Sequence, residues 1–255
     1  MTKRNDGSPL AALRLVSFRP LQGVQRKTRD RAAFLQPIEQ GIGRMNIDNY
    51  RVQISKLPRW NDKEIPIGDF FQYFRKNINL FLDRNTCVFK PWQPADQAVW
   101  STKNPVGAIV NIDMYTDSGR NPESGAVLCS DAGPDYWIFS TLTGAGLGTH
   151  PVNGNREFGY TLEGEGAIVY TMAVDRVTPN PFHSFAFMSD MIFAGGHRTW
   201  LGLQSRLAQY VNINGGVARA LSPSSQRLDW LTVGRPAFGP QVPLVGKAVA
   251  PPRVR

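Results

Sequence analysis

A polar stretch between two apolar segments carries the residues of this chain best suited to acid–base chemistry. The stretch His150–Gly159 holds an imidazole, two asparagines, a guanidinium and a carboxylate. His150 can act as a general acid or base, and Arg156 can clamp an anionic or carbonyl group. A carboxylate, Glu157 or Asp175, would orient the imidazole. These residue types therefore fit proton transfer beside a clamped substrate group.

The backbone of this stretch is expected to be a loop. Its proline and glycines predict irregular structure, and loops held between strands often carry binding and catalytic groups. If Asp175 and Arg176 lie on a strand, their side chains point to opposite faces, so only one of them can share a site with His150. The candidate site residues are His150, Arg156, Glu157 and Asp175.

The same stretch also fits a purely structural turn. Asn153 or Asn155 can adopt the unusual backbone angles of a turn. Arg156 can then pair with Glu157 or Asp175 across a sheet. Strongly perturbed charged groups also occur in structural ion-pair networks. The sequence therefore leaves open whether the protein is an enzyme.

Other catalytic patterns are incomplete. His150, His183 and His197 lack the HExxH or HxH spacing that would hold a metal ion together with Asp175. Gly195-Gly196 lacks the lysine and serine of a phosphate-binding loop and predicts the start of a helix instead. The chain has no G-x-S-x-G motif, which disfavours serine hydrolase chemistry. The sequence indicates no metal site and leaves any cofactor unknown.

Positive charge is concentrated at the two ends of the 255-residue chain, whose formal net charge is +9. Residues 1–45 hold nine Lys or Arg against three Asp or Glu, and residues 227–255 hold five against one. The middle of the chain is nearly balanced, with fifteen against sixteen. This distribution argues against a basic nucleic-acid-binding face on the folded body. The ends can attract polyanions or serve as solvated arms.

Cysteine content and hydropathy limit the classes of protein that we expect for this chain. Cys87 and Cys129 are too few for a metal site or a disulfide scaffold, and both are expected to be buried. Arg14 interrupts the apolar segment Leu10–Phe18, so no Sec signal peptide is expected. No apolar run reaches eighteen residues, so we expect no transmembrane helix. The expected location is the cytoplasm, or outside the cell by a Sec-independent route.

Two helices and several strands are expected in the body of the chain. A phenylalanine stripe at helical spacing predicts a helix over residues 67–82, and Trp200–Val211 repeats the pattern. Helix, strands and helix in this order predict an α+β fold, with a mainly antiparallel sheet and helices packed on one face. The expected strands are Val106–Met114, Gly125–Cys129, Tyr136–Thr143, Phe158–Leu162 and Ala167–Val174, the last two joined by a glycine hairpin turn.

The expected organisation is one α+β domain, residues 46–230, flanked by flexible basic tails. Residues 1–45 carry scattered leucines without sustained periodicity, which is typical of a mobile arm. Residues 231–255 contain five prolines, which lack amide donors and predict an extended tail.

Residues from about 65 to 220 resemble a group of bacterial secretion-associated and toxin-like proteins. Those proteins favour serine where this chain has Asn153, which weakens any role for a hydroxyl there. The resemblance implies effector biology, fits a partner or immunity protein, and carries over no catalytic role. It rests on His150–Gly159, which matches His-Pro-Val-x-Gly-x-Arg-x-Phe-Gly, and on Trp137–Thr141, Val174–Arg176 and the segment from Trp200 to Gly216.

We therefore expect an effector-like or toxin-associated domain with a polar site at His150–Gly159. The alternative is a non-enzymatic interaction module whose basic tails dock nucleic acid, an anionic surface or a partner protein. A third interpretation is a structural domain of a larger assembly, with its aromatic residues supplying contact area.

Overall fold

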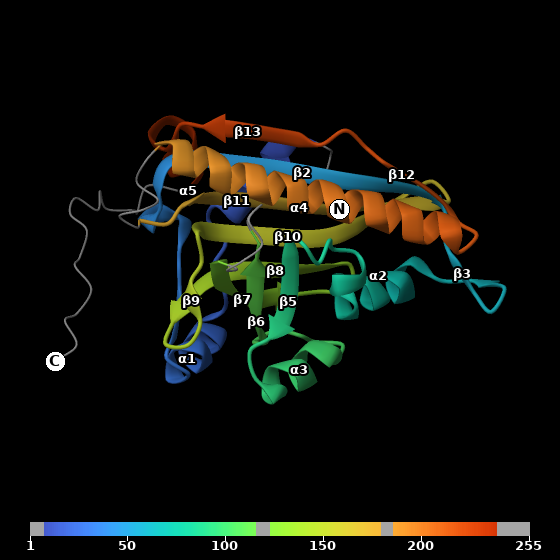
Figure 1. The fold of residues 1–255 in the computed structure, drawn as a ribbon, viewed down its shortest axis with the longest axis horizontal. Coiled ribbons are helices and arrows are strands. Elements are labelled where there is room, and N and C mark those ends of the chain that lie inside the picture. Colours follow the sequence, from blue (N-terminus) through green and yellow to red (C-terminus); the bar gives the residue numbers. More distant parts are fainter. Residues whose placement is uncertain (1–7, 116–122, 180–185, 239–255) are drawn as a thin grey trace.

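The computed structural model describes residues 8–115, 123–179 and 186–238, which form an α+β fold around a sheet of 11 strands (Figure 1). The expected fold class is confirmed. The helices are η1 Pro9–Leu15, α1 Gln22–Asp30, η2 Ile38–Gln40, α2 Ile67–Lys76, η3 Ile78–Leu80, α3 Pro94–Ser101, α4 Ala186–Ile213, η4 Trp230–Gly234 and α5 Arg235–Phe238. The strands are β1 Ala33–Leu35, β2 Ile42–Lys56, β3 Arg59–Trp60, β4 Lys63–Glu64, β5 Cys87–Pro91, β6 Ile109–Met114, β7 Glu123–Ala132, β8 Tyr136–Gly144, β9 Gly148–Thr149, β10 Val152–Glu163, β11 Gly166–Val177, β12 Val217–Ala220 and β13 Ser224–Leu228.

The large sheet is antiparallel, in the order β12-β2-β11-β10-β8-β7-β6-β5. β13 also pairs with β2, and β1 and β9 pair with β8. The expected hairpin is present, because β10 and β11 pair along their whole length and Gly164 in the turn has φ of +59°. A positive φ is accessible to glycine without steric strain. The three strands β2, β11 and β10 thus lie side by side in the centre of the fold.

One face of the sheet, called the helix face below, is packed by the two expected helices. Phe71 and Phe74 of α2 contact the Trp137 ring, with centroids 4.9 and 5.6 Å apart. Trp137 stacks on Phe158 of β10 at 4.7 Å. The second half of α4 adds Leu203, Leu207 and Val211 to this core. The phenylalanine stripe is therefore core, as its helical spacing predicts.

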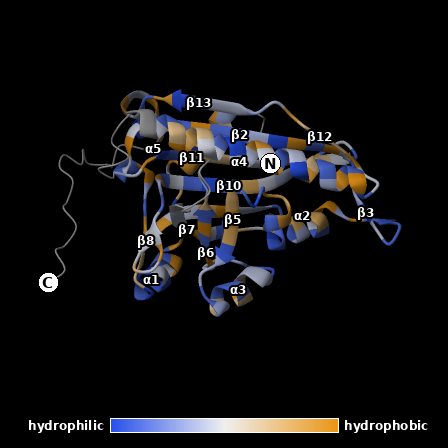
Figure 2. Ribbon diagram, viewed as in Figure 1, coloured by the Kyte–Doolittle hydropathy of each residue, from blue (hydrophilic) through white to orange (hydrophobic). Residues whose placement is uncertain are grey.

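The lengths of these two helices differ from the expectation. α2 ends at Lys76, and the chain continues through the short 3-10 helix η3. α4 begins at Ala186 instead of Trp200, so Gly195 and Gly196 lie inside a helix and do not start one. Figure 2 shows hydrophilic and hydrophobic residues mixed along α4. Because the first half of this helix lacks a clear helical repeat of apolar residues, the sequence pattern did not predict it.

The opposite face, called the N-terminal face, is covered by residues 8–41. Leu15, Val16 and Ile38 pack with Met172 and Val174 of β11. The expectation of a mobile arm therefore does not hold for residues 8–45, and the expected boundary at residue 45 falls inside β2. Burial of its scattered apolar side chains holds this segment on the sheet. These side chains show neither a helical nor a strand repeat in the sequence, so the pattern did not predict their burial. Residues 1–7 of the expected arm lie outside the described residues.

The described part of the expected C-terminal tail is helical, not extended. Trp230–Gly234 forms one turn of π-helix, and Arg235–Phe238 continues as α5. Pro236 is tolerated because it lies in the first turn of α5, where an amide donor is not needed. The other four tail prolines lie in residues 239–255, outside the described part of the chain.

Candidate functional site

The stretch expected as a loop is a strand from Val152 onward. Its glycines serve close packing: a Cβ on Gly154 would lie 2.1 Å from the Val174 carbonyl oxygen, and a Cβ on Gly159 would lie 2.5 Å from the Tyr170 hydroxyl. Successive side chains on a strand alternate between the two faces. Arg156 and Glu157 therefore belong to different environments.

Glu157 lies on the N-terminal face, fully buried. Its Oε1 accepts hydrogen bonds from Arg14 Nη2 at 2.6 Å and from the Tyr170 hydroxyl at 2.7 Å. Its Oε2 is buried and has no hydrogen-bond partner among the described residues. One guanidinium thus balances one carboxylate, and the pair ties η1 to β10.

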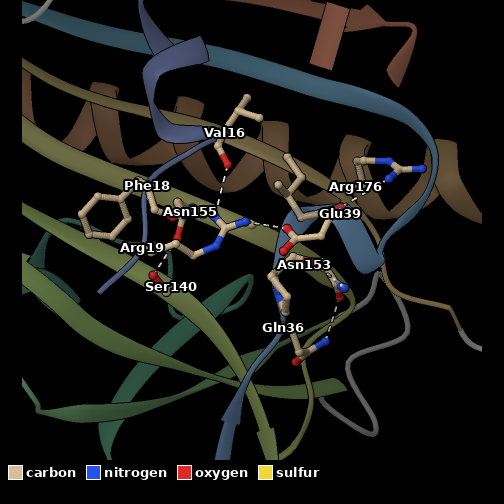
Figure 3. Close-up of polar contacts among 12 residues, drawn as sticks. Val16, Phe18, Arg19, Gln36, Glu39, Ser140, Asn153, Asn155 and Arg176 are labelled. Carbon is tan, nitrogen blue, oxygen red and sulfur yellow. Dashed lines mark hydrogen bonds and ion pairs between the residues drawn. The ribbon is translucent and has the colours of Figure 1, made fainter. Parts of the chain in front are cut away.

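The two asparagines of the motif also hold the N-terminal segment (Figure 3). Gln36 Nε2 donates to Asn153 Oδ1 at 3.0 Å. Asn155 Nδ2 donates to the Leu15 carbonyl oxygen at 2.9 Å, and Asn155 Oδ1 accepts from the Ser140 hydroxyl at 2.6 Å. These bonds satisfy buried polar groups. Asn153 and Asn155 therefore stabilise the fold, but the expected turn with unusual backbone angles at these residues is wrong, because both lie in the strand β10.

His150 is buried beside the start of β10. Its Nδ1 lies 3.1 Å from the Val152 carbonyl oxygen and 3.3 Å from the Val152 amide nitrogen. Burial lowers the pKa of His150 to about 4, with a smaller effect from the Arg156 charge in the same direction. No carboxylate of the described chain forms a hydrogen bond or ion pair with this imidazole, so the expected orientation of His150 by Glu157 or Asp175 is not observed.

Arg156 points to the helix face and pairs with a strand far away in sequence. Its Nη2 donates to Asp48 Oδ2 of β2 at 2.8 Å, and its Nη1 donates to the Thr171 hydroxyl at 3.2 Å. The guanidinium lies 4.1 Å from the ring centroid of Trp200 on α4. The partner of Arg156 is therefore Asp48, and neither Glu157 nor Asp175 takes that place.

Asp175 joins Arg156 and Asp48 on the helix face. It lies opposite Asn46 of β2 and Gly154 of β10. This row is two residues along the strands from the row that holds Asp48, Ala173 and Arg156, so both rows face the same side. The pKa of Asp175 is raised to about 7, chiefly by burial and next by the negative charge of Asp48, while the charges of Arg156 and Arg227 and a hydrogen bond with the Asn46 side chain partly offset the rise.

Arg176 takes the opposite face, as strand alternation predicts. Its guanidinium Nη1 donates to the Ile38 carbonyl oxygen at 3.3 Å and lies over the Trp230 ring, 4.5 Å from the centroid. Asp175, and not Arg176, is thus the member of this pair that shares a face with Arg156.

The first half of α4 closes this polar region. His197 Nδ1 lies 2.7 Å from the Tyr50 hydroxyl. Arg227 of β13 lies 4.0 Å from the Phe193 ring centroid and 3.5 Å from Asp190 of α4. The region, called the carboxylate cluster below, consists of Asn46, Asp48, Tyr50, Arg156, Thr171 and Asp175 from the sheet, with His197 and Trp200 from α4.

Two oxygen atoms of the cluster stand out. Oδ1 of Asp48 and Oδ1 of Asp175 are buried and have no hydrogen-bond partner among the described residues. A buried acceptor left without a donor costs about 1–3 kcal/mol, and more when it is charged. Two such carboxylate oxygens on neighbouring strands mark a place that favours a bound donor.

The sequence analysis did not identify Asp48, Tyr50 and Trp200 as site residues. The sequence does contain a signal for Asp48 and Tyr50. Every second residue of β2 lies on the helix face, and these residues are Asn46, Asp48, Tyr50, Val52 and Ile54. Proximity to residues 156 and 175, however, depends on the strand order.

Other features of the described chain do not add to the cluster. Within these ranges no group of three His, Cys, Asp or Glu residues is placed to hold a metal ion, and His183 lies outside them. Cys87 and Cys129 are buried in the core as expected. No described helix is long and apolar enough to cross a membrane. Two hollows, of about 70 and 240 Å³, both border Asn79 and include no residue of the cluster.

Comparison with known proteins gives only distant similarity. No family model and no curated protein sequence matches the chain. Among solved structures, the di-domain ARO/CYC StfQ from the steffimycin biosynthetic pathway matches with 9% identity and a TM-score of 0.42, over 66% of this chain and 52% of that chain. This chain therefore spans about half of StfQ. Ara h 8.0201 matches with 9% identity and a TM-score of 0.40, over 66% and 99% of the two chains. Major latex-like protein 151 from Panax ginseng matches with 11% identity and a TM-score of 0.39, over 66% and 99%.

Proposed function

We propose that this protein is an effector-like or toxin-associated domain whose functional centre is the carboxylate cluster beneath α4. The observation that carries the proposal is the convergence of two buried carboxylates, Asp48 and Asp175, each with one oxygen that lacks a donor within the described chain. A strongly perturbed acid such as Asp175 is typical of functional sites.

The chemistry that the cluster supports is proton transfer by Asp175. Its pKa of about 7 lies near neutral pH, where a general acid or base is most effective. Arg156 neutralises Asp48 through a direct ion pair, so the two carboxylates have different roles. Arg156 and Asp175 of the expected site remain in this proposal, whereas Glu157 and His150 position the surrounding structure.

Access to the cluster is proposed beneath the first half of α4. The second half is anchored in the core by Leu203, Leu207 and Val211. The first half meets the sheet through the contact of His197 with the Tyr50 hydroxyl and through Arg227, which is partly exposed. A Cβ on Gly195 would contact nothing within 4 Å, so packing does not require glycine there. Glycine instead lowers helix stability at the junction of the two halves.

The test is growth of bacteria that express the chain in the cytoplasm or, with an added signal peptide, in the periplasm. Wild-type protein should inhibit growth in one compartment, and Asp175→Asn should abolish the inhibition while the protein stays folded. Asp113→Asn is the matched control, because Asp113 is a partly buried sheet carboxylate that pairs with Lys90 elsewhere. Harmless wild-type protein in both compartments, or full inhibition by folded Asp175→Asn, contradicts the proposal.

A second candidate is a non-enzymatic interaction module, favoured by the exposed cations of α1. Arg26, Lys27 and Arg29 of this helix are exposed, and such a group can dock nucleic acid, an anionic surface or an acidic partner or immunity protein. By contrast, Arg14 and Arg19 of the same segment are engaged in ion pairs.

Charge reversal tests this candidate better than deletion, because residues 8–41 are part of the core. Replacing Arg26, Lys27 and Arg29 by Glu should remove binding to a DNA duplex or an anionic vesicle, and with it the steep salt dependence. Unchanged binding by the triple variant would exclude α1 as the docking site.

A further inference from the structure

We infer that the carboxylate cluster binds a protonated primary amine of its ligand between Asp48 and Asp175. The inference rests on the proposed function for the location of the site, and it adds the chemical class of the ligand. It is carried by the positions, the hydrogen bonds and the charges of the groups that face this point.

The two carboxylates are close enough to share one ligand group. Ala173 of β11 lies opposite Asp48, and Asp175 lies opposite Asn46, so Asp48 and Asp175 are diagonal neighbours on paired strands. Diagonal neighbours on one face are about 7–8 Å apart at their backbones, which lets their side chains approach a common atom. Both residues are more than nine-tenths buried.

The Asn46 side chain hydrogen-bonds to both Asp48 and Asp175, and one oxygen of each carboxylate still remains without a donor from the described chain. Asp48 Oδ2 accepts from Arg156 at 2.8 Å and from Asn46 at 3.3 Å. Asp48 Oδ1 and Asp175 Oδ1 lack a donor from the described residues. An ammonium group has three N–H donors and no acceptor, so it can serve both oxygens at once.

The charges of the facing groups select a cation. The sheet contributes Asp48, Asp175 and Arg156, and the Arg156 guanidinium is paired with Asp48. From the other elements, Arg227 of β13 is paired with Asp190 of α4, and the imidazole of His197 is engaged with the Tyr50 hydroxyl. Asp175 therefore forms no ion pair within the described chain, and the charges of Arg156 and Arg227 act on it only from further away. An anionic ligand would face two carboxylates, which excludes it.

Binding of a cation here must be linked to a proton. Asp175 binds the ammonium as a carboxylate, and its pKa in the free protein is about 7. Below that pH, binding releases one proton, so affinity rises about tenfold per pH unit and then levels off. A neutral donor such as an alcohol needs no ionised Asp175 and shows no such slope.

The experiment is an NMR titration of the full chain with n-butylammonium, followed at the indole N–H of Trp200, with 1-butanol and butyrate as matched probes. We expect n-butylammonium to bind, with affinity that rises about tenfold per pH unit between pH 5 and the pKa of Asp175. Folded Asp175→Asn should weaken this binding at least tenfold at pH 8, whereas Asp113→Asn should leave it unchanged.

Three results would overturn the inference. These are equal binding of 1-butanol, absence of n-butylammonium binding, and n-butylammonium binding that Asp175→Asn leaves intact. The growth assay separates this failure from that of the proposed function. If Asp175→Asn abolishes growth inhibition but the wild-type protein does not bind n-butylammonium, the cluster is functional and the ligand class is wrong.

Discussion

The two faces of β10 carry buried charge in different ways. On the N-terminal face, Glu157 is paired with Arg14 and accepts a second hydrogen bond from Tyr170. On the helix face, Arg156 is paired with Asp48, whereas Asp175 forms no ion pair within the described chain. Both faces leave a carboxylate oxygen without a donor from the described chain, so burial alone does not separate them. The difference is direct pairing: Glu157 has an ion pair, whereas Asp175 has none within the described chain and is reached by the charges of Arg156 and Arg227 only from further away.

This contrast teaches how a single strand can serve two purposes. Alternation places Asn153, Asn155 and Glu157 against the N-terminal segment, where they stabilise the fold. It places Arg156 on the same face as Asp175, a buried carboxylate without an ion pair in the described chain, where we propose the functional centre. Under that proposal, neighbouring residues of one motif support stability and function separately.

The largest effect on stability is expected from Glu157→Ala. The substitution removes the acceptor of Arg14 and Tyr170 and leaves a cavity in a buried network. We expect the free energy of unfolding to fall by about 3 kcal/mol, measured by urea denaturation. Glu165→Ala, in the exposed hairpin turn, is the control and should change it by less than about 0.5 kcal/mol. A similarly small change for Glu157→Ala would show that the N-terminal face does not depend on this ion pair.

The next effect is the pH dependence of Asp175. Its pKa is raised to about 7 in the folded protein, so the folded state holds this proton more tightly than the unfolded state. The contribution to stability is complete below the unfolded pKa and is lost as pH rises towards 7. Asp175→Asn should therefore be more stable than wild type at pH 8, and this difference should shrink as the pH falls from 7 towards 4.

His150 must be separated from this effect. Its pKa is lowered to about 4, so its contribution to stability is lost as pH falls from 6.5 towards 4. Because both proteins contain His150, the difference between wild type and Asp175→Asn cancels that slope. If the difference does not change with pH, Asp175 does not have a raised pKa.

A smaller loss is expected for Asn155→Ala. The Ser140 hydroxyl and the Leu15 carbonyl oxygen would each lose a buried partner. Unfolding free energy should fall by about 1–2 kcal/mol, while binding of n-butylammonium stays as in the wild type. Loss of that binding in a folded Asn155→Ala protein would break the separation between the two faces.

The smallest effect on stability is expected from replacing single glycines of α4 by alanine. Gly195→Ala and Gly202→Ala should each stabilise the helix by up to about 1 kcal/mol, because a Cβ meets open space at both positions. Only Gly195→Ala should also slow hydrogen exchange in residues 186–194 and reduce growth inhibition. Equal effects of the two variants would mean that the first half of α4 does not control access.

Sequence patterns identified the elements with strong periodicity. The phenylalanine stripe gave α2, alternating apolar segments gave β6, β7 and β8, and glycine in the turn gave the β10–β11 hairpin. The packing of segment 8–41 was not predicted because Leu15, Val16 and Ile38 have no regular spacing in the sequence. Their burial depends on contacts with the sheet, which the local sequence does not show. The first half of α4 was missed because glycines interrupt a weak pattern.

The geometry of the candidate site was harder to predict than the residue types that it contains. Arg156 and Asp175 were proposed from their residue types, and their chemical role stays a prediction. The opposite directions of Asp175 and Arg176 followed from strand alternation. Treating His150–Gly159 as a loop removed that alternation, so Glu157 was grouped with Arg156. Asp48 was missed because its contact with Arg156 depends on the order β2-β11-β10, which no local pattern contains.

The most direct test of the central claim compares growth inhibition by two folded variants. Asp175→Asn changes the helix face and should retain or gain stability, whereas Arg14→Ala weakens the N-terminal face and should lose stability. The account predicts that Asp175→Asn loses growth inhibition and that Arg14→Ala, expressed at a temperature where it stays folded, retains it. Retained inhibition by Asp175→Asn together with loss by folded Arg14→Ala would place the functional centre on the opposite face and contradict the account.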